Sequence, residues 1–174
     1  MTKAAPAGPA AASRTASRDG FYAFEVSLHR HPGEAGEGPA YADAWGTWPT
    51  LAVPREAALS PLAISGDQAL ERLAAEPRLF AEPDGSFVWT SRQDGPAWQV
   101  DGNLLERDGR VVLLDLKGSC PRGEFDRLLA CVGWPAEPLM FQLVRAAVFL
   151  DEAAFRRHAA ARGAAGDGQA LRPD

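Results

Sequence analysis

Three side chains of the types used in metal-assisted hydrolysis lie in the middle of the chain: Asp101, Asp115 and Lys117. They belong to the stretch 98–118, WQVDGNLLERDGRVVLLDLKG. Two carboxylates on one face can bind Mg²⁺ or Mn²⁺, because hard cations prefer oxygen ligands. A lysine beside them can orient a metal-bound water or neutralise charge that builds up on a phosphate. Together these residue types are suited to the cleavage of a phosphodiester.

The stretch 98–118 is predicted to be a β-hairpin, since two runs rich in Val and Leu flank Arg107-Asp108-Gly109. A two-residue turn would pair Arg107 with Arg110, which places like charges opposite each other. A three-residue loop with Gly109 in the left-handed conformation pairs Glu106 with Arg110 instead. We therefore expect the three-residue loop.

That register also predicts which side chains share a face, because side chains alternate along a strand. Asp101 then lies opposite Asp115, with Lys117 two residues further along the same face. The other face collects the apolar residues Trp98, Val100, Leu104, Val112, Leu114 and Leu116. The hairpin is thus expected to hold the three polar side chains together on its exposed side.

The rest of the chain supplies elements that can position the hairpin. Alternation in 20–30 predicts a half-buried strand. An apolar stripe with Ser65 or Asp67 as its N-cap predicts a helix that ends at residue 76. The segments 31–40 and 118–123 are expected to be loops. Further predicted elements are strands over 86–91 and 139–144, with 146–150 as an alternative extension of the second strand. Helices are predicted over 124–132 and from the cap Asp151 to Arg162.

From residue 67 to residue 144 the predicted order is helix, three antiparallel strands, helix, strand. A helical crossover before the last strand favours a parallel, right-handed connection. The expected fold is α+β (or α/β): a single domain over 19–162 with a mixed β-sheet, a central antiparallel hairpin and flanking helices. The segments 1–18 and 163–174 lack large apolar side chains and are expected to be disordered tails.

This arrangement resembles the core of the PD-(D/E)XK nuclease superfamily. The matching residues are Asp101 and the triplet Asp115-Leu116-Lys117, while Val100 stands where the family has its proline. The resemblance implies that Asp101 and Asp115 bind Mg²⁺ or Mn²⁺, with Glu71 completing the metal site from a helix. It also implies that Lys117 assists the attacking water and that the substrate is a nucleic acid.

The charge balance supports a different class of function. The formal net charge is −5, which disfavours the binding of a polyanion. An acidic surface and a segment with Trp45 and Trp48 fit a non-enzymatic protein-interaction or regulatory module whose partner is another protein. The tryptophans are suited to stacking on a ligand or, in the ordinary case, to packing against the sheet.

Other features of the sequence suggest weaker sites. Cys120 beside Arg122 fits a thiol nucleophile, although no histidine partner is evident and a buried thiol is the ordinary alternative. His29 and His31 form a potential metal pair that lacks a third ligand. No apolar run reaches the length of a membrane helix and no signal peptide is evident, so we expect a cytoplasmic protein without membrane contact.

Overall fold

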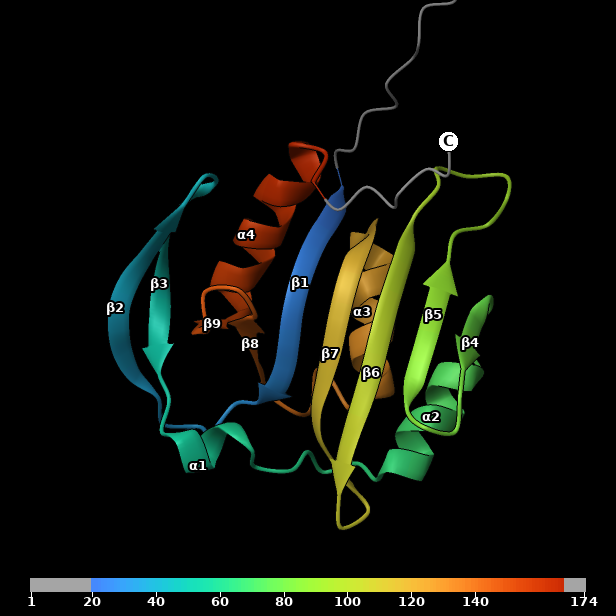
Figure 1. The fold of residues 1–174 in the computed structure, drawn as a ribbon, viewed down its shortest axis with the longest axis horizontal. Helices are drawn as coiled ribbons and strands as arrows, with labels where there is room; N and C mark the ends of the chain where they lie inside the picture. Colours follow the sequence, from blue (N-terminus) through green and yellow to red (C-terminus); the bar gives the residue numbers. More distant parts are fainter. Residues whose placement is uncertain (1–19, 168–174) are drawn as a thin grey trace, which may run out of the picture.

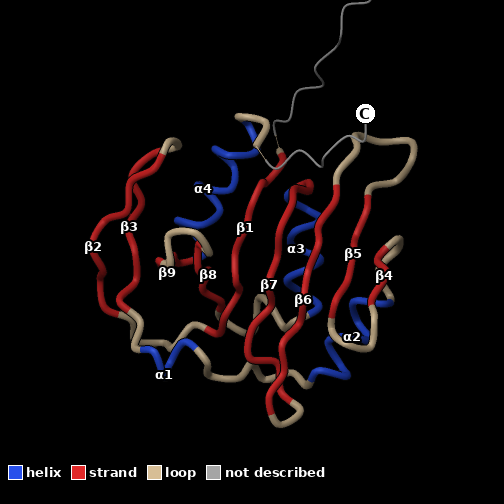
Figure 2. The backbone as a smooth tube through the Cα atoms, viewed as in Figure 1, coloured by secondary structure: helices blue, strands red, loops and turns tan. Residues whose placement is uncertain are grey.

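A nine-stranded β-sheet spans the described part of the molecule, residues 20–167, in the computed structural model (Figure 1 and Figure 2). The predicted tail 1–18 and most of the predicted tail 163–174 lie outside these residues. The strands are β1 (Phe21–Arg30), β2 (Gly36–Asp43), β3 (Gly46–Ala52), β4 (Leu79–Ala81), β5 (Ser86–Thr90), β6 (Gln99–Arg107), β7 (Arg110–Pro121), β8 (Leu139–Leu143) and β9 (Val148–Asp151). The helices are α1 (Arg55–Ala58), α2 (Gly66–Ala74), α3 (Arg122–Cys131) and α4 (Glu152–Ala164). The described residues thus form a single α+β domain.

The strands follow the order β2-β3-β9-β8-β1-β7-β6-β5-β4, and every pair of neighbours is antiparallel. The prediction of a mixed sheet is therefore wrong. β7 and β8 run in the same direction on either side of α3, as the predicted crossover requires, but β1 lies between them and is antiparallel to both. β1 thus separates β7 from β8, the two strands that would otherwise have formed a parallel pair.

The central position of β1 also explains its burial. Its sequence alternates like that of a strand with one solvated face, yet Ala23, Ser27 and His29 on the polar side are buried as well. The Nδ1 of His29 donates a hydrogen bond to the carbonyl oxygen of Ala58, 2.7 Å away, at the end of α1. Neighbouring strands on both sides and the segment around α1 therefore cover positions that alternation alone assigns to solvent.

The β6–β7 hairpin has a different register from the predicted one. Asp108 and Gly109 form a two-residue turn with φ of 52° and 74°, and Arg107 pairs with Arg110. The expected like-charge clash is relieved because the Nη1 of Arg110 donates a hydrogen bond to the carbonyl oxygen of Ala63, 2.6 Å away. The prediction of a three-residue loop is thus wrong, because a contact distant in sequence supplies a partner for the arginine.

A β-bulge in β7 then restores the predicted faces. Leu105 pairs with Leu113 and Glu106 with Val111, so Val112 is an extra residue on β7. Beyond the bulge, Asp101 lies opposite Lys117 rather than opposite Asp115. The alternation of faces is as predicted, but the two strands are shifted by two residues relative to the expected pairing.

Four strands differ from the prediction. β2 begins inside the predicted loop 31–40, β3 and β4 have no predicted counterpart, and β9 forms a hairpin with β8 instead of extending it. Gly118 to Pro121, also predicted as loop, continue β7 because they pair with β1. These segments are strands because of the neighbours they meet in the sheet, since Gly and Pro disfavour strands locally.

The helices agree more closely with the sequence. Ser65 caps α2 and accepts a hydrogen bond from the backbone N–H of Gln68, and Asp151 caps α4 by accepting one from Ala154. α4 ends at Ala164, two residues beyond the predicted Arg162. None of the helices within residues 20–167 is long and apolar enough to cross a bilayer.

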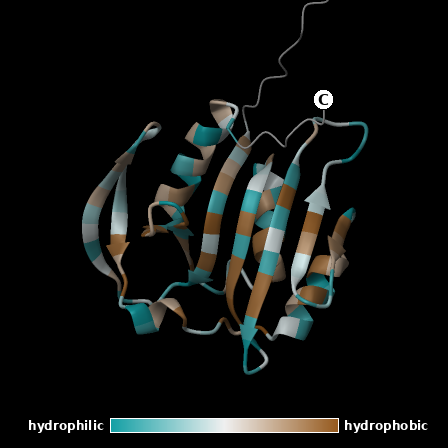
Figure 3. Cartoon of the chain, in the orientation of Figure 1, coloured by the Kyte–Doolittle hydropathy of each residue, from teal (hydrophilic) through white to brown (hydrophobic). Residues whose placement is uncertain are grey.

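The helices α2 and α3 lie behind one face of the sheet, and no described helix covers the opposite face of β5, β6 and β7 (Figure 1). Apolar and polar bands alternate along these strands (Figure 3). The side chains that point toward the helices are buried: Val100, Leu104, Leu114 and Leu116. The opposite, uncovered face is exposed at Asp101, Asn103 and Lys117.

α4 occupies a gap in the sheet rather than one of its faces. β8 pairs with β1 only between Val26 and Arg30, so the first half of β1 lacks a strand on that side. α4 lies there, between β1 and β3 (Figure 1). A Cβ on Gly163 would be 2.4 Å from the carbonyl oxygen of Phe21, so the helix approaches the strand this closely only with glycine at that position.

Candidate functional site

The uncovered face of the sheet brings together the three side chains singled out from the sequence. Asp101 on β6 and Asp115 and Lys117 on β7 line one hollow of about 430 Å³, here called the sheet hollow. Other polar residues in its lining are Glu25 and Ser27 on β1 and Asn103 on β6. Alternation along β1, β6 and β7 points these side chains the same way, as expected for antiparallel neighbours.

Each carboxylate in the sheet hollow already has a polar partner. Asp115 accepts a hydrogen bond from the hydroxyl of Ser27, and Asp101 Oδ1 accepts one from Gln99 Nε2 at 2.7 Å. The ammonium of Lys117 is 3.5 Å from Glu25 Oε1. These contacts give each carboxylate a partner within the protein but leave the hollow with a net negative charge.

The pairing pattern fits a shared metal poorly. Lys117 is the direct cross-strand neighbour of Asp101, while Asp115 is diagonal to it, a separation of about 7–8 Å between Cα atoms in such ladders. Glu71, the third ligand implied by the resemblance, lies on α2 behind the covered face and does not join the pair. No group of three or more His, Cys, Asp or Glu within residues 20–167 is arranged to hold a metal ion.

Large apolar side chains accompany these charges on the uncovered face. Phe80 is 65% exposed, Val88 38%, Leu105 39% and Val144 47%. Phe80 pairs with Val88, Val88 with Asp101, Asp101 with Lys117, and Lys117 with Glu25. These five residues form one row across β4, β5, β6, β7 and β1, here called the cross-strand row. The sequence did not reveal it because β4 was not predicted.

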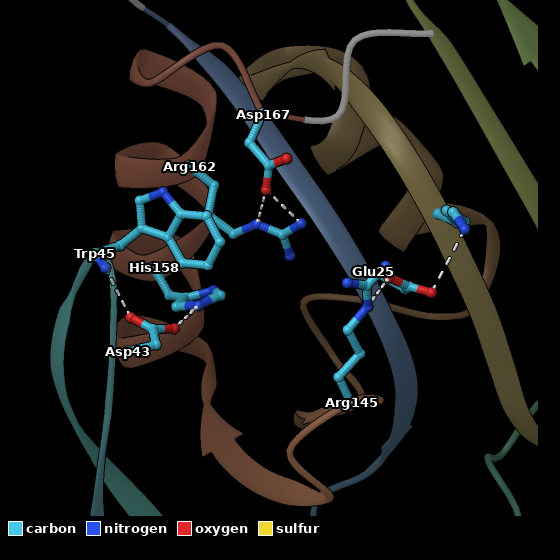
Figure 4. Close-up of polar contacts among 8 residues, drawn as sticks. Glu25, Asp43, Trp45, Arg145, His158, Arg162 and Asp167 are labelled. Carbon is cyan, nitrogen blue, oxygen red and sulfur yellow. Dashed lines mark hydrogen bonds and ion pairs between the residues drawn. The ribbon is translucent and has the colours of Figure 1, made fainter. Parts of the chain in front are cut away.

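A second polar cluster borders the uncovered face where α4 meets the turns of the β2–β3 and β8–β9 hairpins (Figure 4). It surrounds a cavity of about 180 Å³, here called the side pocket. Asp43 accepts hydrogen bonds from the backbone N–H of Trp45 at 2.9 Å, from Trp48 Nε1 at 3.1 Å and from His158 Nε2 at 2.9 Å. The β2–β3 turn is thereby fastened to α4.

The cations of the side pocket are also paired (Figure 4). Arg162 donates to Asp167 through both Nε and a terminal nitrogen, each at 2.7 Å, and its guanidinium lies 5.0 Å from the centre of the Trp45 ring. Arg145 Nε is 2.9 Å from Glu25 Oε2. Glu25 therefore connects the side pocket to the sheet hollow, because its other oxygen faces Lys117.

The protonation states of Asp43 and His158 decide which atoms of the pair donate and which accept hydrogen bonds. Burial lowers the pKa of His158 below its ordinary value, although Asp43 acts to raise it. Burial raises the pKa of Asp43, but hydrogen bonds from Trp48, Trp45 and His158 outweigh it and hold that pKa below its ordinary value. At neutral pH the imidazole is therefore neutral, with Nε2–H donating to the carboxylate. Its Nδ1 is a bare acceptor, buried and without a hydrogen-bond partner among the described residues.

The weaker sites suggested by the sequence are not assembled. Cys120 is fully buried on β7, and burial raises the pKa of its thiol, the opposite of what a thiolate nucleophile needs. His29 is buried against α1, and burial lowers its pKa, whereas His31 accepts a hydrogen bond from the backbone of Gly33 in a loop. Trp48 is 8% exposed and packs edge-on against His158, so it is a packing residue.

Comparison with known proteins shows no matching family model, and neither the curated proteins nor the solved structures contain a match. Functional assignment therefore depends on the sheet hollow, the cross-strand row and the side pocket.

Proposed function

We propose that this chain is a non-enzymatic protein-binding module whose uncovered sheet face docks a partner protein with basic and apolar side chains. The observation that carries the proposal is the cross-strand row, which joins Phe80 and Val88 to Asp101, Lys117 and Glu25. Two exposed apolar side chains adjoin there a carboxylate, a lysine and a second carboxylate, within one continuous strip of surface.

The apolar half of the row is unusual for a sheet face in water. An antiparallel sheet commonly leaves one face solvated, and that face is then polar. Here Phe80 and Val88 are exposed as direct cross-strand neighbours, and Leu105 is exposed on the same face further along β6. Clustered rather than scattered exposure of large apolar residues is typical of interaction surfaces. A partner that covered them would remove this area from water.

The charge of the sheet hollow indicates the chemistry of that partner. Its carboxylates are Glu25, Asp101 and Asp115, and its one cation is Lys117, which gives a net charge of −2. The whole chain carries −5. A positively charged partner associates faster with this negative surface, and a negatively charged one is repelled. A basic protein surface is therefore favoured as the partner and a nucleic acid is disfavoured.

Selection from displayed random peptides, followed by titration of the purified peptides, tests the proposal. We expect the selected sequences to combine Lys or Arg with large apolar residues, and their affinity to fall as salt is added. Val88→Asp and Asp101→Lys are each expected to weaken binding about tenfold, because each places an unfavourable group at the centre of the row. Asp94→Lys is the matched control, since Asp94 lies in an exposed loop away from the row and pairs with Arg92.

Three outcomes would contradict the proposal. These are a set of selected peptides that is acidic, binding of the peptides by Asp101→Lys that equals that of the wild type, and a titration that leaves the amide signals of β4, β5, β6, β7 and β1 unshifted. Light scattering adds a further check, because a stable dimer whose formation Val88→Asp abolishes would make a second copy of the chain the occupant.

The hydrolytic alternative has one observation in its favour, namely that Asp101, Asp115 and Lys117 line the same hollow. A metal held by both aspartates would stabilise the folded chain by mass action. Under the binding proposal, millimolar Mg²⁺ or Mn²⁺ leaves the melting midpoints of the wild type and Asp115→Asn equally unchanged, because Ser27 and Gln99 already donate hydrogen bonds to Asp115 and Asp101. A rise in the wild type alone, with nucleic-acid cleavage lost in Lys117→Ala, would establish the metal-dependent phosphodiesterase instead.

A further inference from the structure

We infer that the side pocket is the anchor point for a single basic side chain, Lys or Arg, of the partner that docks on the sheet face. This inference rests on the proposed function and deepens it. The side pocket and the sheet hollow share Glu25 and Val144 in their linings, so a partner that lies along β6, β7 and β1 reaches the pocket without a break.

The charges around the side pocket favour a cation. Its carboxylates belong to Glu25, Asp43 and Asp167, and its guanidiniums to Arg145 and Arg162, which leaves a net charge of −1 with a neutral imidazole. Arg145 is 83% exposed, and an exposed ion pair contributes little free energy. An incoming cation can therefore replace Arg145 at Glu25 at small cost.

The hydrogen-bonding groups point to the same kind of ligand. The side chain of His158 is 3% exposed and lines the pocket, and its neutral ring has an acceptor, Nδ1, that receives no hydrogen bond from residues 20–167. Lysine and arginine side chains carry only donors. The aromatic rings of Tyr41 and Trp45 also line the cavity, and such rings attract cations.

The same arrangement disfavours an anion. Arg162 is the less exposed of the two guanidiniums. It already makes two contacts with Asp167 Oδ2 and lies over the ring of Trp45. An anion would have to break that pairing and approach three carboxylates. The volume, about 180 Å³, is also below the roughly 300–1,000 Å³ of sites for drug-sized molecules, and suits one side chain.

Capped tripeptides titrated into the full chain and followed through backbone amide signals test this inference. The probes are Gly-Arg-Gly, Gly-Lys-Gly and Gly-citrulline-Gly, the last a neutral analogue of the arginine peptide. We expect the arginine and lysine peptides to shift the signals of Tyr41, Trp45, Ala146 and Arg162, which belong to the side pocket and not to the sheet hollow. The citrulline peptide is expected to bind about tenfold more weakly, because it lacks the charge.

A matched pair of variants completes the experiment. Glu25→Gln keeps the shape of the side chain and is expected to weaken the arginine peptide several-fold, while Glu82→Gln, in the exposed β4–β5 turn, leaves its affinity unchanged. Equal binding of arginine and citrulline, or shifts confined to Asp101, Asn103 and Asp115, would overturn the anchor site. If the selected peptides still bind the sheet face in that case, the proposed function stands without its anchor; if they do not, both fail.

Discussion

Replacing Phe125 by alanine is expected to lower the free energy of unfolding by about 3–5 kcal/mol, the usual loss for a large aromatic residue removed from a core. The side chain is fully buried on α3. Its ring lies between 5.0 and 6.3 Å from four other rings, those of Tyr22, Phe24, Phe141 and Phe155. Truncation would leave a cavity where α3, α4, β1 and β8 meet, and this junction holds both helices against the two strands.

Urea unfolding followed by far-UV circular dichroism measures this loss, and Phe80→Ala is the matched control. Phe80 is 65% exposed on the opposite face, so its truncation is expected to change stability by no more than about 0.5 kcal/mol while it weakens partner binding. A loss below about 1 kcal/mol for Phe125→Ala would show that the surrounding rings close the cavity.

Stability is expected to fall as the pH is lowered from about 7.5 to about 5, because two buried histidines are neutral in the folded chain. Burial lowers the pKa of His29 and of His158 below the ordinary value of 6.5, despite a carbonyl and a carboxylate that act to raise them. The unfolded chain therefore takes up protons at a higher pH than the folded chain does. The stability that these histidines confer is present above pH 6.5 and is lost as the pH falls below it, by at most about 1.4 kcal/mol per pH unit for each histidine.

Urea titrations at several pH values give the slope directly. His158→Gln and His29→Gln are each expected to flatten the dependence, and the double variant to remove most of it. His31→Gln serves as the control, since that imidazole lies in a loop and contacts the backbone of Gly33. A free energy of unfolding that stays constant from about pH 7.5 to about pH 5 would contradict the assignment of both rings as buried and neutral.

Local sequence determined the helices and the composition of each strand face. Ser65 and Asp151 cap α2 and α4 where the sequence predicts, because a cap is satisfied by backbone N–H groups within three residues. Asp101, Asp115 and Lys117 share a face, as predicted, because alternation along a strand depends only on sequence position. These features need no knowledge of distant segments.

Only the tertiary structure decided which strands are neighbours and which residues meet across them. β1 lies between β7 and β8, so every neighbouring pair in the sheet is antiparallel. His29 is buried on the face of β1 that alternation assigned to water. Ala63 accepted a hydrogen bond from Arg110, which permitted the tight turn, and the bulge at Val112 then placed Lys117 opposite Asp101. Each of these contacts joins residues far apart in the chain, so the free energy that selects them is not encoded in any local pattern.

The same distinction applies to the functional surfaces. The polar half of the sheet hollow follows from one hairpin and was accessible from its sequence. The cross-strand row needs β4, which is too short to predict, and the side pocket needs the pairing of Asp43 with His158, 115 residues away. A side chain acquires its solvent exposure and its partners from the packed structure. The Asp43–His158 pair is therefore buried, and lies beside Glu25, only because α4 fills the gap next to β1.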